Sequence, residues 1–392
     1  MPTITHAPLL TRSIMLAALT KTVHPDSELS IPWCRSGDRA FWFSRSAWSL
    51  MAIAQWRQHL RAGETPIVIW LPDFFCNSSL TPLRRMAMKL RFYPVTVLLE
   101  PDMDACRAMS IESCPDLFIL VHFFGQKAPT HDATKFCAET GAWLVEDAAH
   151  VLSPLQGIGE HGDFILYSPH KHLPLPDGAV LVVRLNGPAN LASQPFSMKT
   201  LDDICQNIIA APGFSKMRSI LWLVKRIIQG IGIRARWKPV AKFLTEDDTT
   251  NLELEHPKMS SHAKRILSGL LGTLDDVADM RRRNRQLWIQ ALVTANPNRQ
   301  VMRSVPGEAT PYLAGFAFAD ETQAEKTYLQ WQQVGLPVTT WPDLPPEVSG
   351  NTAMHRTAVK LRKTRIYLPV HQTIAPQQIK EFAARISREA YA

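Results

Sequence analysis

The sequence has few cysteines for its length, no CxxC pair, and no long hydrophobic run. Its six cysteines among 392 residues predict reduced thiols rather than a disulfide framework. The N-terminal apolar run, Ile14 to Leu19, is far shorter than a signal-peptide core with its cleavage site. No stretch approaches the roughly 20 apolar residues that a membrane-spanning helix needs. We therefore expect a soluble, cytoplasmic protein.

Acidic residues are absent from one long segment, Ile204 to Thr245, and this absence explains the charge of the whole chain. The sequence has 43 basic and 35 acidic residues, a formal net charge of +8. The segment supplies eight positive charges: Lys216, Arg218, Lys225, Arg226, Arg234, Arg236, Lys238 and Lys242. The rest of the chain is neutral overall, so a general nucleic-acid-binding surface is not expected.

Short apolar strands alternate with helices between about residues 40 and 183. Helices are predicted over Trp48–Leu60, Leu83–Leu90 and His131–Thr140, and strands over Ile67–Leu71, Arg91–Val95, Leu117–Phe124, Trp143–Glu146, Phe164–Tyr167 and Ala179–Val183. Gly141 gives the third helix its C-terminal signal. This rhythm predicts an α/β fold with a mostly parallel sheet between helices.

A second unit follows the acid-free segment. A strand is predicted over Tyr312–Phe318 and helices over Glu321–Val334 and Pro376–Tyr391. We therefore predict a large domain at 30–250 and a small α+β domain at 251–392, with residues 1–29 as an arm that packs on either. The basic run Arg281 to Arg283 is interpreted as a solvated helix face.

Three segments of the large domain carry groups suited to one cofactor. Ser44, Arg45 and Ser46 precede a helix, whose free N–H groups and dipole attract an anion. Asp147 ends an apolar strand, at the edge where α/β sheets bind ligands. Lys171 follows another strand, where burial would leave a nucleophilic amine. Phosphate on the helix, pyridine nitrogen on the carboxylate and aldehyde on the lysine describe pyridoxal 5'-phosphate (PLP).

The motifs around these residues resemble the DegT/DnrJ/StrS family of sugar aminotransferases, which have PLP fold type I. The resembling motifs are Val121-His122-Phe-Phe-Gly125-Gln126, Glu146-Asp147-Ala148-Ala149-His150, Ser168 to Lys171 with Asp177-Gly178, Leu71-Pro72 with Phe74, Phe75 and Cys76, and Leu368-Pro369-Val370-His371. They cover most of the chain. Ser168 lies three residues before Lys171 where the family pattern has five, and Arg45 replaces a small residue, which indicates a divergent branch.

The resemblance implies a role for each matching position. Lys171 would bind PLP as a Schiff base and move a proton, Asp147 would keep the pyridine nitrogen protonated, and His150 would lie against the ring or its phenolic oxygen. Ser168 with Ser44, Arg45 and Ser46 would bind the phosphate, and Phe74 or Phe75 would stack on the ring. It also implies a homodimer that transfers an amino group, from glutamate, to a nucleotide-linked keto-sugar in surface polysaccharide or related glycan biosynthesis.

Two other functions are kept as alternatives. His161, Asp163, His170 and His172 could form the metal site of a hydrolase, since a His-x-His pair beside a carboxylate can bind a metal. A PLP-fold protein that binds the cofactor without transamination is the second, because the family's usual substrate segment is not found.

The acid-free segment has two interpretations. Its apolar residues recur at helical spacing: Ile220, Leu223, Val224, Ile227, Ile228 and Ile231. Basic residues and Trp237 follow, a composition suited to a water–lipid boundary. The segment is therefore either a helix packed on the core or, over residues 216–242, a peripheral contact with an anionic membrane at the inner face.

Overall fold

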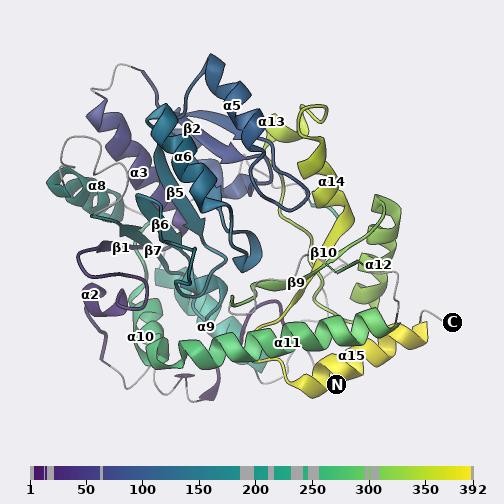
Figure 1. Cartoon of the computed structure of the whole chain (residues 1–392). Coiled ribbons are helices and arrows are strands. Elements are labelled where there is room, and N and C mark those ends of the chain that lie inside the picture. The colour runs from purple at the N-terminus through teal and green to yellow at the C-terminus, as the bar shows by residue number, and fades with distance from the viewer. Residues whose placement is uncertain are drawn as a thin grey trace.

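A computed structural model of the chain describes residues 4–12, 14–15, 22–61, 65–185, 198–210, 216–230, 242–245, 256–295, 300–301 and 309–389. Its large sheet has seven strands in the order β1-β7-β6-β5-β4-β2-β3. They are β1 (Arg39–Phe43), β2 (Val68–Pro72), β3 (Lys89–Tyr93), β4 (Leu117–Val121), β5 (Trp143–Ala148), β6 (Phe164–Tyr167) and β7 (Ala179–Val183). Figure 1 shows this sheet surrounded by helices.

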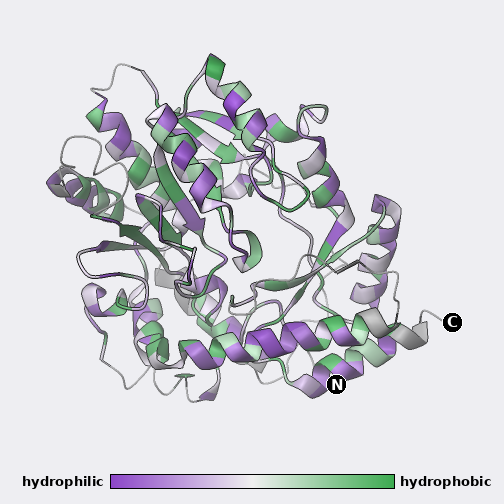
Figure 2. Cartoon of the chain, in the orientation of Figure 1, coloured by the Kyte–Doolittle hydropathy of each residue, from purple (hydrophilic) through white to green (hydrophobic). Residues whose placement is uncertain are grey.

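The sheet is parallel from β3 to β6, while β7 runs antiparallel to both β6 and β1. Every residue of β4, β5, β6 and β7 is buried, and Figure 2 shows these strands as largely hydrophobic. Burial on both faces explains the continuous apolar runs of the sequence. The predicted fold class, an α/β protein with a mostly parallel sheet, is confirmed.

Two hydrophobic cores cover the two faces of this sheet. One core contains residues of α3 (Ser46–Leu60), η1 (Asn77–Leu80), α4 (Thr81–Arg85), α5 (Met103–Glu112), α6 (Thr130–Thr140) and α8 (Met198–Ala210). The other contains residues of α2 (Asp26–Leu29), α10 (Ser261–Leu270) and the start of α11 (Leu274–Ala295), which follows η4 (Leu271–Thr273). The sheet is therefore buried between helical layers.

A third core belongs to the C-terminal part of the chain. Its small antiparallel sheet has the order β10-β9-β8. The elements are β8 (Gln300–Val301), β9 (Leu313–Ala317), α12 (Glu321–Gln333), α13 (Pro346–Ser349), α14 (Arg356–Thr364), β10 (Arg365–Pro369) and α15 (Pro376–Glu389). Helix α11 joins this core through Trp288 and Leu292. Figure 1 shows α11 running beneath both parts of the molecule and beside α15.

Some predicted boundaries are wrong. The helix expected over Leu83–Leu90 ends at Arg85, because Ala87 has a left-handed φ of 54° and β3 begins at Lys89. The predictions also omitted β1, although it pairs along its whole length with β7. By contrast, α6 ends where Gly141 adopts a φ of 74°, as its sequence signal indicated.

The N-terminal arm contacts both parts of the chain. The hydroxyl of Thr373, in the C-terminal part, accepts the N–H of Leu9 at 3.1 Å. On α10, a helix that packs on the large sheet, Ser268 accepts the N–H of His24 at 3.1 Å. The arm therefore contacts both α10 and the segment that follows β10.

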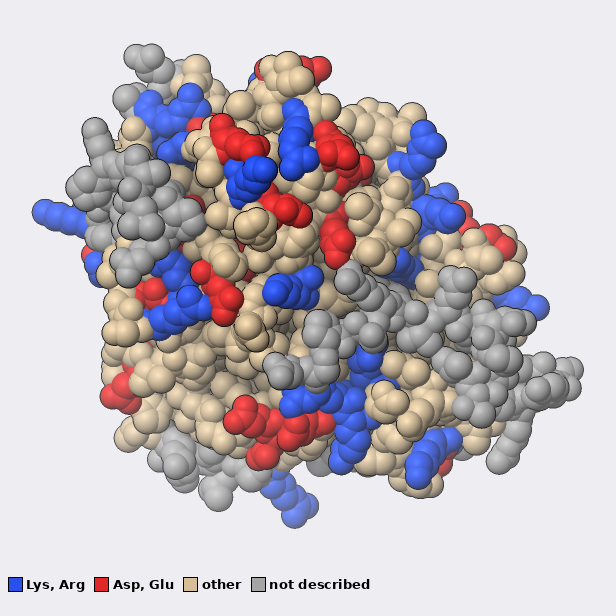
Figure 3. Space-filling view, viewed as in Figure 1, with Lys and Arg blue, Asp and Glu red and all other residues tan. Residues whose placement is uncertain are grey.

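Charged side chains of both signs are intermixed on the face seen in Figure 3. Within the described ranges, no helix combines the length and apolar character required to cross a membrane.

Candidate active site

A cavity of about 570 Å³ opens at the C-terminal ends of β5 and β6, against the C-terminal part of the chain. Asp147, Lys171, His150 and Ser46 all line it. Four residues that the sequence placed in one site are therefore brought together by neighbouring strand ends and by the start of α3.

Asp147 and Lys171 both line the cavity, and their charges interact. Asp147 lies near the end of β5, and its Oδ1 accepts the N–H of Ala149 at 3.0 Å. Lys171 ends η3 (Pro169–Lys171), just past β6. Burial lowers the pKa of Lys171, an effect that the Asp147 charge opposes. Burial likewise raises the pKa of Asp147, opposed by Lys171. The lysine amine is therefore more easily deprotonated than an exposed one.

Glu146 points away from this pair and anchors the loop before β6. Its carboxylate accepts the Nε2–H of His122 at 2.8 Å and the N–H groups of Gly159, His161 and Gly162 at 2.6–2.8 Å. Although burial alone would raise it, these bonds lower the pKa of Glu146 to about 2. His122 Nδ1 accepts the N–H of Ala128 at 3.1 Å. The Glu146 side chain is thus a structural support behind the site.

His150 lies in a column of aromatic rings. Its ring stacks on Tyr312 with centroids 4.4 Å apart and on Phe124 at 5.5 Å, and Phe124 stacks in turn on Tyr367 at 4.7 Å. The Phe124 N–H donates to His150 Nδ1 at 3.2 Å. Burial, followed by the charge of Lys171, holds the pKa of His150 well below its usual range. His150 is therefore neutral, with its proton on Nε2 as a hydrogen-bond donor.

Tyr312 was not predicted as a site residue, although it lines the cavity. Besides stacking on His150, its ring lies 5.9 Å from Lys171 Nζ. No local pattern in the sequence indicates this residue, because Tyr312 reaches the cavity from the C-terminal part of the chain.

The hydroxyls of Ser44 and Ser168 are buried, and neither has a hydrogen-bond partner within the described ranges. Ser44 follows β1 and Ser168 follows β6, and both strands pair with the first residues of β7. Helix α3 begins beside them without a side-chain cap, which leaves first-turn N–H groups for an anion. Two unpartnered hydroxyls at a helix start fit the phosphate of PLP.

Arg45 is held elsewhere. Both of its terminal nitrogens lie 3.2 Å from the carbonyl oxygen of Pro176, so the guanidinium supports the loop that follows Lys171. Among the four predicted phosphate ligands, Ser46 lines the cavity, whereas Ser44, Arg45 and Ser168 do not.

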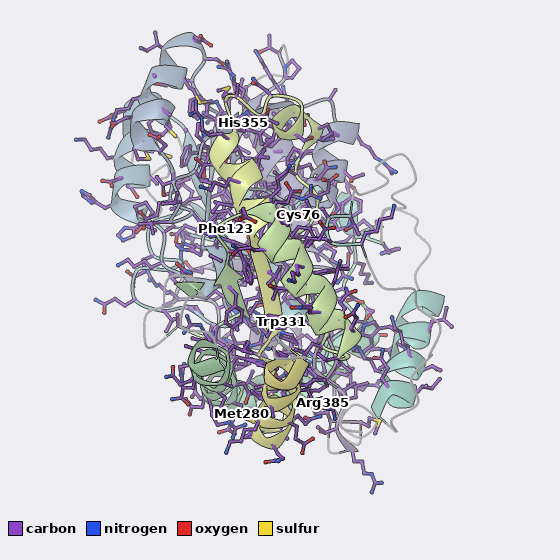
Figure 4. All side chains as sticks on the ribbon, turned by 90° about the vertical axis from the view of Figure 1, so that its right-hand side faces the viewer. Cys76, Phe123, Met280, Trp331, His355 and Arg385 are labelled. Carbon is purple, nitrogen blue, oxygen red and sulfur yellow. The ribbon has the colours of Figure 1, made fainter. Side chains whose placement is uncertain are left out.

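The aromatic pair after β2 divides between core and cavity. Phe74 is fully buried and stacks on Trp341 at 4.5 Å. Phe75 and Cys76 line the cavity, and Cys76 Sγ lies 3.1 Å from Ser78 Oγ. Figure 4 shows Cys76 and Phe123 in the middle of the molecule. Of the two candidates for stacking on a cofactor ring, only Phe75 is placed at the cavity wall.

Asp73 connects this segment to the C-terminal part of the chain. Its carboxylate lies 3.1 Å from His355 Nδ1, just before α14, and accepts the N–H of Val95 at 3.1 Å. Burial raises the pKa of Asp73, and the bond from His355 opposes that effect. The pair fixes the loop that carries Phe75 and Cys76.

The cavity wall includes several polar and basic groups and carries little negative charge. Gln332, Thr339 and Thr340 contribute neutral donors and acceptors, and Lys242 and His6 contribute basic groups. Asp147 is the sole carboxylate among the described residues that line the cavity. This composition suits a hydroxyl-rich molecule with an anionic group.

The metal-site alternative is not supported. Asp163 precedes β6 and its carboxylate accepts the N–H of Leu144 at 2.9 Å, whereas His170 and His172 follow the opposite end of β6. Throughout the described ranges, no group of three or more His, Cys, Asp or Glu side chains could hold a metal ion.

Comparisons with known proteins place the fold. No family model and no curated protein match the sequence. The structure is similar to the aminotransferase TlmJ from Streptoalloteichus hindustanus, with a TM-score of 0.68 and 15% identity over 100% of this chain and 99% of that one. It is also similar to PseC of Helicobacter pylori, an aminotransferase involved in pseudoaminic acid biosynthesis, with a TM-score of 0.69 and 12% identity over 99% and 100% of the two chains.

The PLP form of Spr1654, a putative sugar aminotransferase of Streptococcus pneumoniae, has a TM-score of 0.70 and 11% identity over 99% of both chains. A DegT/DnrJ/EryC1/StrS aminotransferase from Brucella abortus is a further match, with a TM-score of 0.62 and 14% identity over 98% of this chain and 91% of that one. The chain therefore has the fold of the PLP-dependent sugar aminotransferases of the DegT type.

Proposed function

We propose that this protein is a PLP-dependent aminotransferase that transfers an amino group to a keto-sugar. The observation that carries the proposal is that Lys171 and Asp147 follow or end neighbouring strands and line one cavity, where their charges interact. Bound PLP would supply an electron sink for the carbanion formed when a substrate proton is removed.

Each residue of the chain would have a defined task. Lys171, with its lowered pKa, would hold the aldehyde of bound PLP and would carry a proton at Nζ. Asp147 would keep the pyridine nitrogen protonated. His150, whose Nδ1 accepts the Phe124 N–H, would have its Nε2–H available for the phenolic oxygen. Ser44, Ser46, Ser168 and the N–H groups of α3 bind the phosphate.

The finer substrate assignment follows the resemblance and the cavity. Glutamate is the proposed amino donor, and the acceptor is a nucleotide-linked keto-sugar for surface polysaccharide or a related glycan. The neutral polar wall with Lys242 and His6 supports an acceptor that combines hydroxyls with phosphate. Crystals soaked with candidate nucleotide sugars would identify it.

Borohydride reduction of the PLP-loaded protein, followed by peptide mapping, tests the central assignment. The phosphopyridoxyl label should lie on Lys171, and a label on another lysine would end the proposal. Asp147→Ala should retain some cofactor yet slow proton abstraction by orders of magnitude, since an unprotonated pyridine is a poor electron sink.

A PLP-binding protein without transamination is the second candidate. It is favoured by the difference from the family pattern around Lys171, where Ser168 lies three rather than five residues before the lysine. The two functions differ in their response to glutamate. A transaminase loses its visible cofactor band when glutamate is added, whereas a protein with the other role keeps its colour with every amino donor.

We also propose a homodimer acting in the cytoplasm. Helix α9 (Lys216–Gly230) supports a dimer, because Leu221 is 60% exposed and Val224 and Ile228 are also exposed. All six cysteines are unpaired, which fits a reducing compartment. Light scattering after size-exclusion chromatography should give twice the chain mass; a stable monomer at micromolar concentration would contradict it.

The membrane hypothesis concerns the same helix. Trp222 and Leu223 pack against the core, whereas Leu221, Val224 and Ile228 are exposed. Lys242 lines the cavity, and Arg234, Arg236, Lys238 and Trp237 lie outside the described residues. Co-sedimentation with anionic liposomes at low salt, absent with neutral ones, would support a peripheral contact; indifference to both would reject it.

A further inference from the structure

Arg281 is a buried cation behind the candidate active site. It lies in the middle of α11 and its side chain is 2% exposed, whereas Arg283 on the same helix is exposed. The interpretation of residues 281–283 as a solvated face is therefore wrong for Arg281. Within the described ranges, no Asp or Glu side chain forms an ion pair with it. Its charge is compensated by other groups.

Those groups are carbonyl oxygens of the segments that form the site. Arg281 Nε donates to Pro311 O at 3.0 Å, Nη2 to Tyr312 O at 2.8 Å, and Nη1 to His172 O at 3.3 Å. Nη1 also donates to Gln372 Oε1 at 3.2 Å, and the Gln372 amide donates to His172 O at 3.1 Å. The guanidinium thus joins three separate segments of the chain.

Two of these carbonyls belong to Tyr312, which lines the cavity, and to His172, which follows a lining residue. His172 directly follows Lys171, and Tyr312 carries the ring that stacks on His150 and faces Lys171 Nζ. A planar guanidinium with several donors fixes the relative position of several acceptors, which an ammonium on a flexible stem does not. The backbone that carries Lys171 is therefore tied through Arg281 to the backbone of the ring facing it.

We propose that Arg281 is a positioning residue for the reaction: it sets the place of Lys171 relative to Tyr312 and keeps the lysine amine over that ring. Arg281 does not touch the cavity. Its effect on the chemistry is transmitted through the carbonyls of His172 and Tyr312. The inference rests on Lys171 being the reactive lysine of the proposed function.

The test measures Lys171 in the protein without cofactor. Trace acetylation with acetic anhydride across a pH series, followed by mass spectrometry of the Lys171 peptide, gives the midpoint of amine deprotonation; exposed Lys89 is the internal reference. In the wild type the Lys171 midpoint should lie below that of Lys89. Arg281→Met should move it toward Lys89 by about one unit, which is a tenfold change in the protonation equilibrium.

Two companion variants separate positioning from charge and from general destabilisation. Arg281→Lys keeps the charge but cannot reach the same set of carbonyls, so it should shift the midpoint in the same direction as Arg281→Met. Arg283→Met changes an exposed position of the same helix and should leave the midpoint unchanged. A wild-type midpoint in Arg281→Lys would show that only charge matters, and an unchanged midpoint in Arg281→Met would show a purely structural role; either result overturns the proposal.

If Arg281→Met does not fold, Gln372→Ala provides the same test, because the Gln372 side chain accepts a hydrogen bond from Arg281 and donates one to the His172 carbonyl. This variant should move the Lys171 midpoint in the same direction by a smaller amount. An unchanged midpoint would overturn the proposal. Borohydride mapping reports independently on the proposed function. A label on another lysine would refute that function, while the acetylation midpoints would still report whether Arg281 positions Lys171.

Discussion

His371 should make the attachment of the N-terminal arm dependent on pH. Its Nε2–H donates to Thr5 O at 2.7 Å, and its Nδ1 lies 2.9 Å from the Thr373 hydroxyl, which also accepts the N–H of Leu9. Burial lowers the pKa of His371 to about 3, with further lowering by Arg281, Arg226 and His6. The neutral ring therefore fastens the arm next to His6, which lines the cavity.

The sign of the effect follows from the lowered pKa. The unfolded chain binds a proton at this histidine near pH 6.5, whereas the folded chain does so only near pH 3. The stability that neutral His371 contributes is therefore complete above pH 6.5 and is lost as the pH falls from there toward 3. At about pH 5, roughly 1.5 units below the unfolded value, the loss is about 2 kcal/mol.

The assay compares the wild type with His371→Gln, whose amide can still donate to Thr5 O but does not titrate. Free energies of unfolding from urea titrations should fall more steeply in the wild type between about pH 8 and pH 5, by about 2 kcal/mol relative to the variant. The contributions of other buried histidines to the free energy of unfolding are the same in both proteins, so they cancel in this difference. Parallel pH dependence in the two proteins would refute the reasoning.

Three other substitutions test the packing behind the site. Gly125→Ala should cost roughly 2–4 kcal/mol in urea unfolding, because φ is +81° and a Cβ would lie 2.7 Å from Thr310 O; Gly141→Ala, equally strained at φ +74° but with open space, is the control. Glu146→Gln should cost about 2–4 kcal/mol by leaving its buried donors unpaired, and an unchanged denaturation midpoint would contradict this. Phe74→Ala should cost roughly 3–5 kcal/mol and weaken PLP binding measured by absorbance, whereas stability loss with unchanged binding would separate Phe74 from the site.

The residues of the candidate site that the sequence predicted are those with local signals. Asp147 and Lys171 each follow an apolar run of strand length, and parallel strands place such positions at the same edge. Gly141 marks the end of α6 by its own conformational freedom. Signals of this kind depend on a few neighbouring residues, so they can be identified without the rest of the fold.

The positions that the sequence did not predict depend on distant contacts. Nothing beside Arg281 in the sequence indicates that its guanidinium meets carbonyls at residues 172, 311 and 312. Phe74 and Phe75 are adjacent and chemically alike, yet Trp341 packs on one and leaves the other at the cavity. The nearest of these partners, Pro311, is 30 residues from Arg281, while His172 is 109 residues from it, so only tertiary structure decides the outcome.

The structure separates the chemical groups from the residues that position them. Asp147 and Lys171 lie at strand ends of the seven-stranded sheet, whereas α11 binds the backbone carbonyl of His172, next to Lys171. On one face of that helix, Arg281 holds the carbonyl of His172, the Asn284 amide donates to His371 O at 3.0 Å, and Trp288 Nε1 donates to Pro369 O at 2.9 Å. Because these donors are spaced three and four residues apart on one rigid helix, a displacement of the C-terminal strand would move the carbonyl next to Lys171 as well. The geometry of the lysine is therefore coupled to the packing of the C-terminal domain.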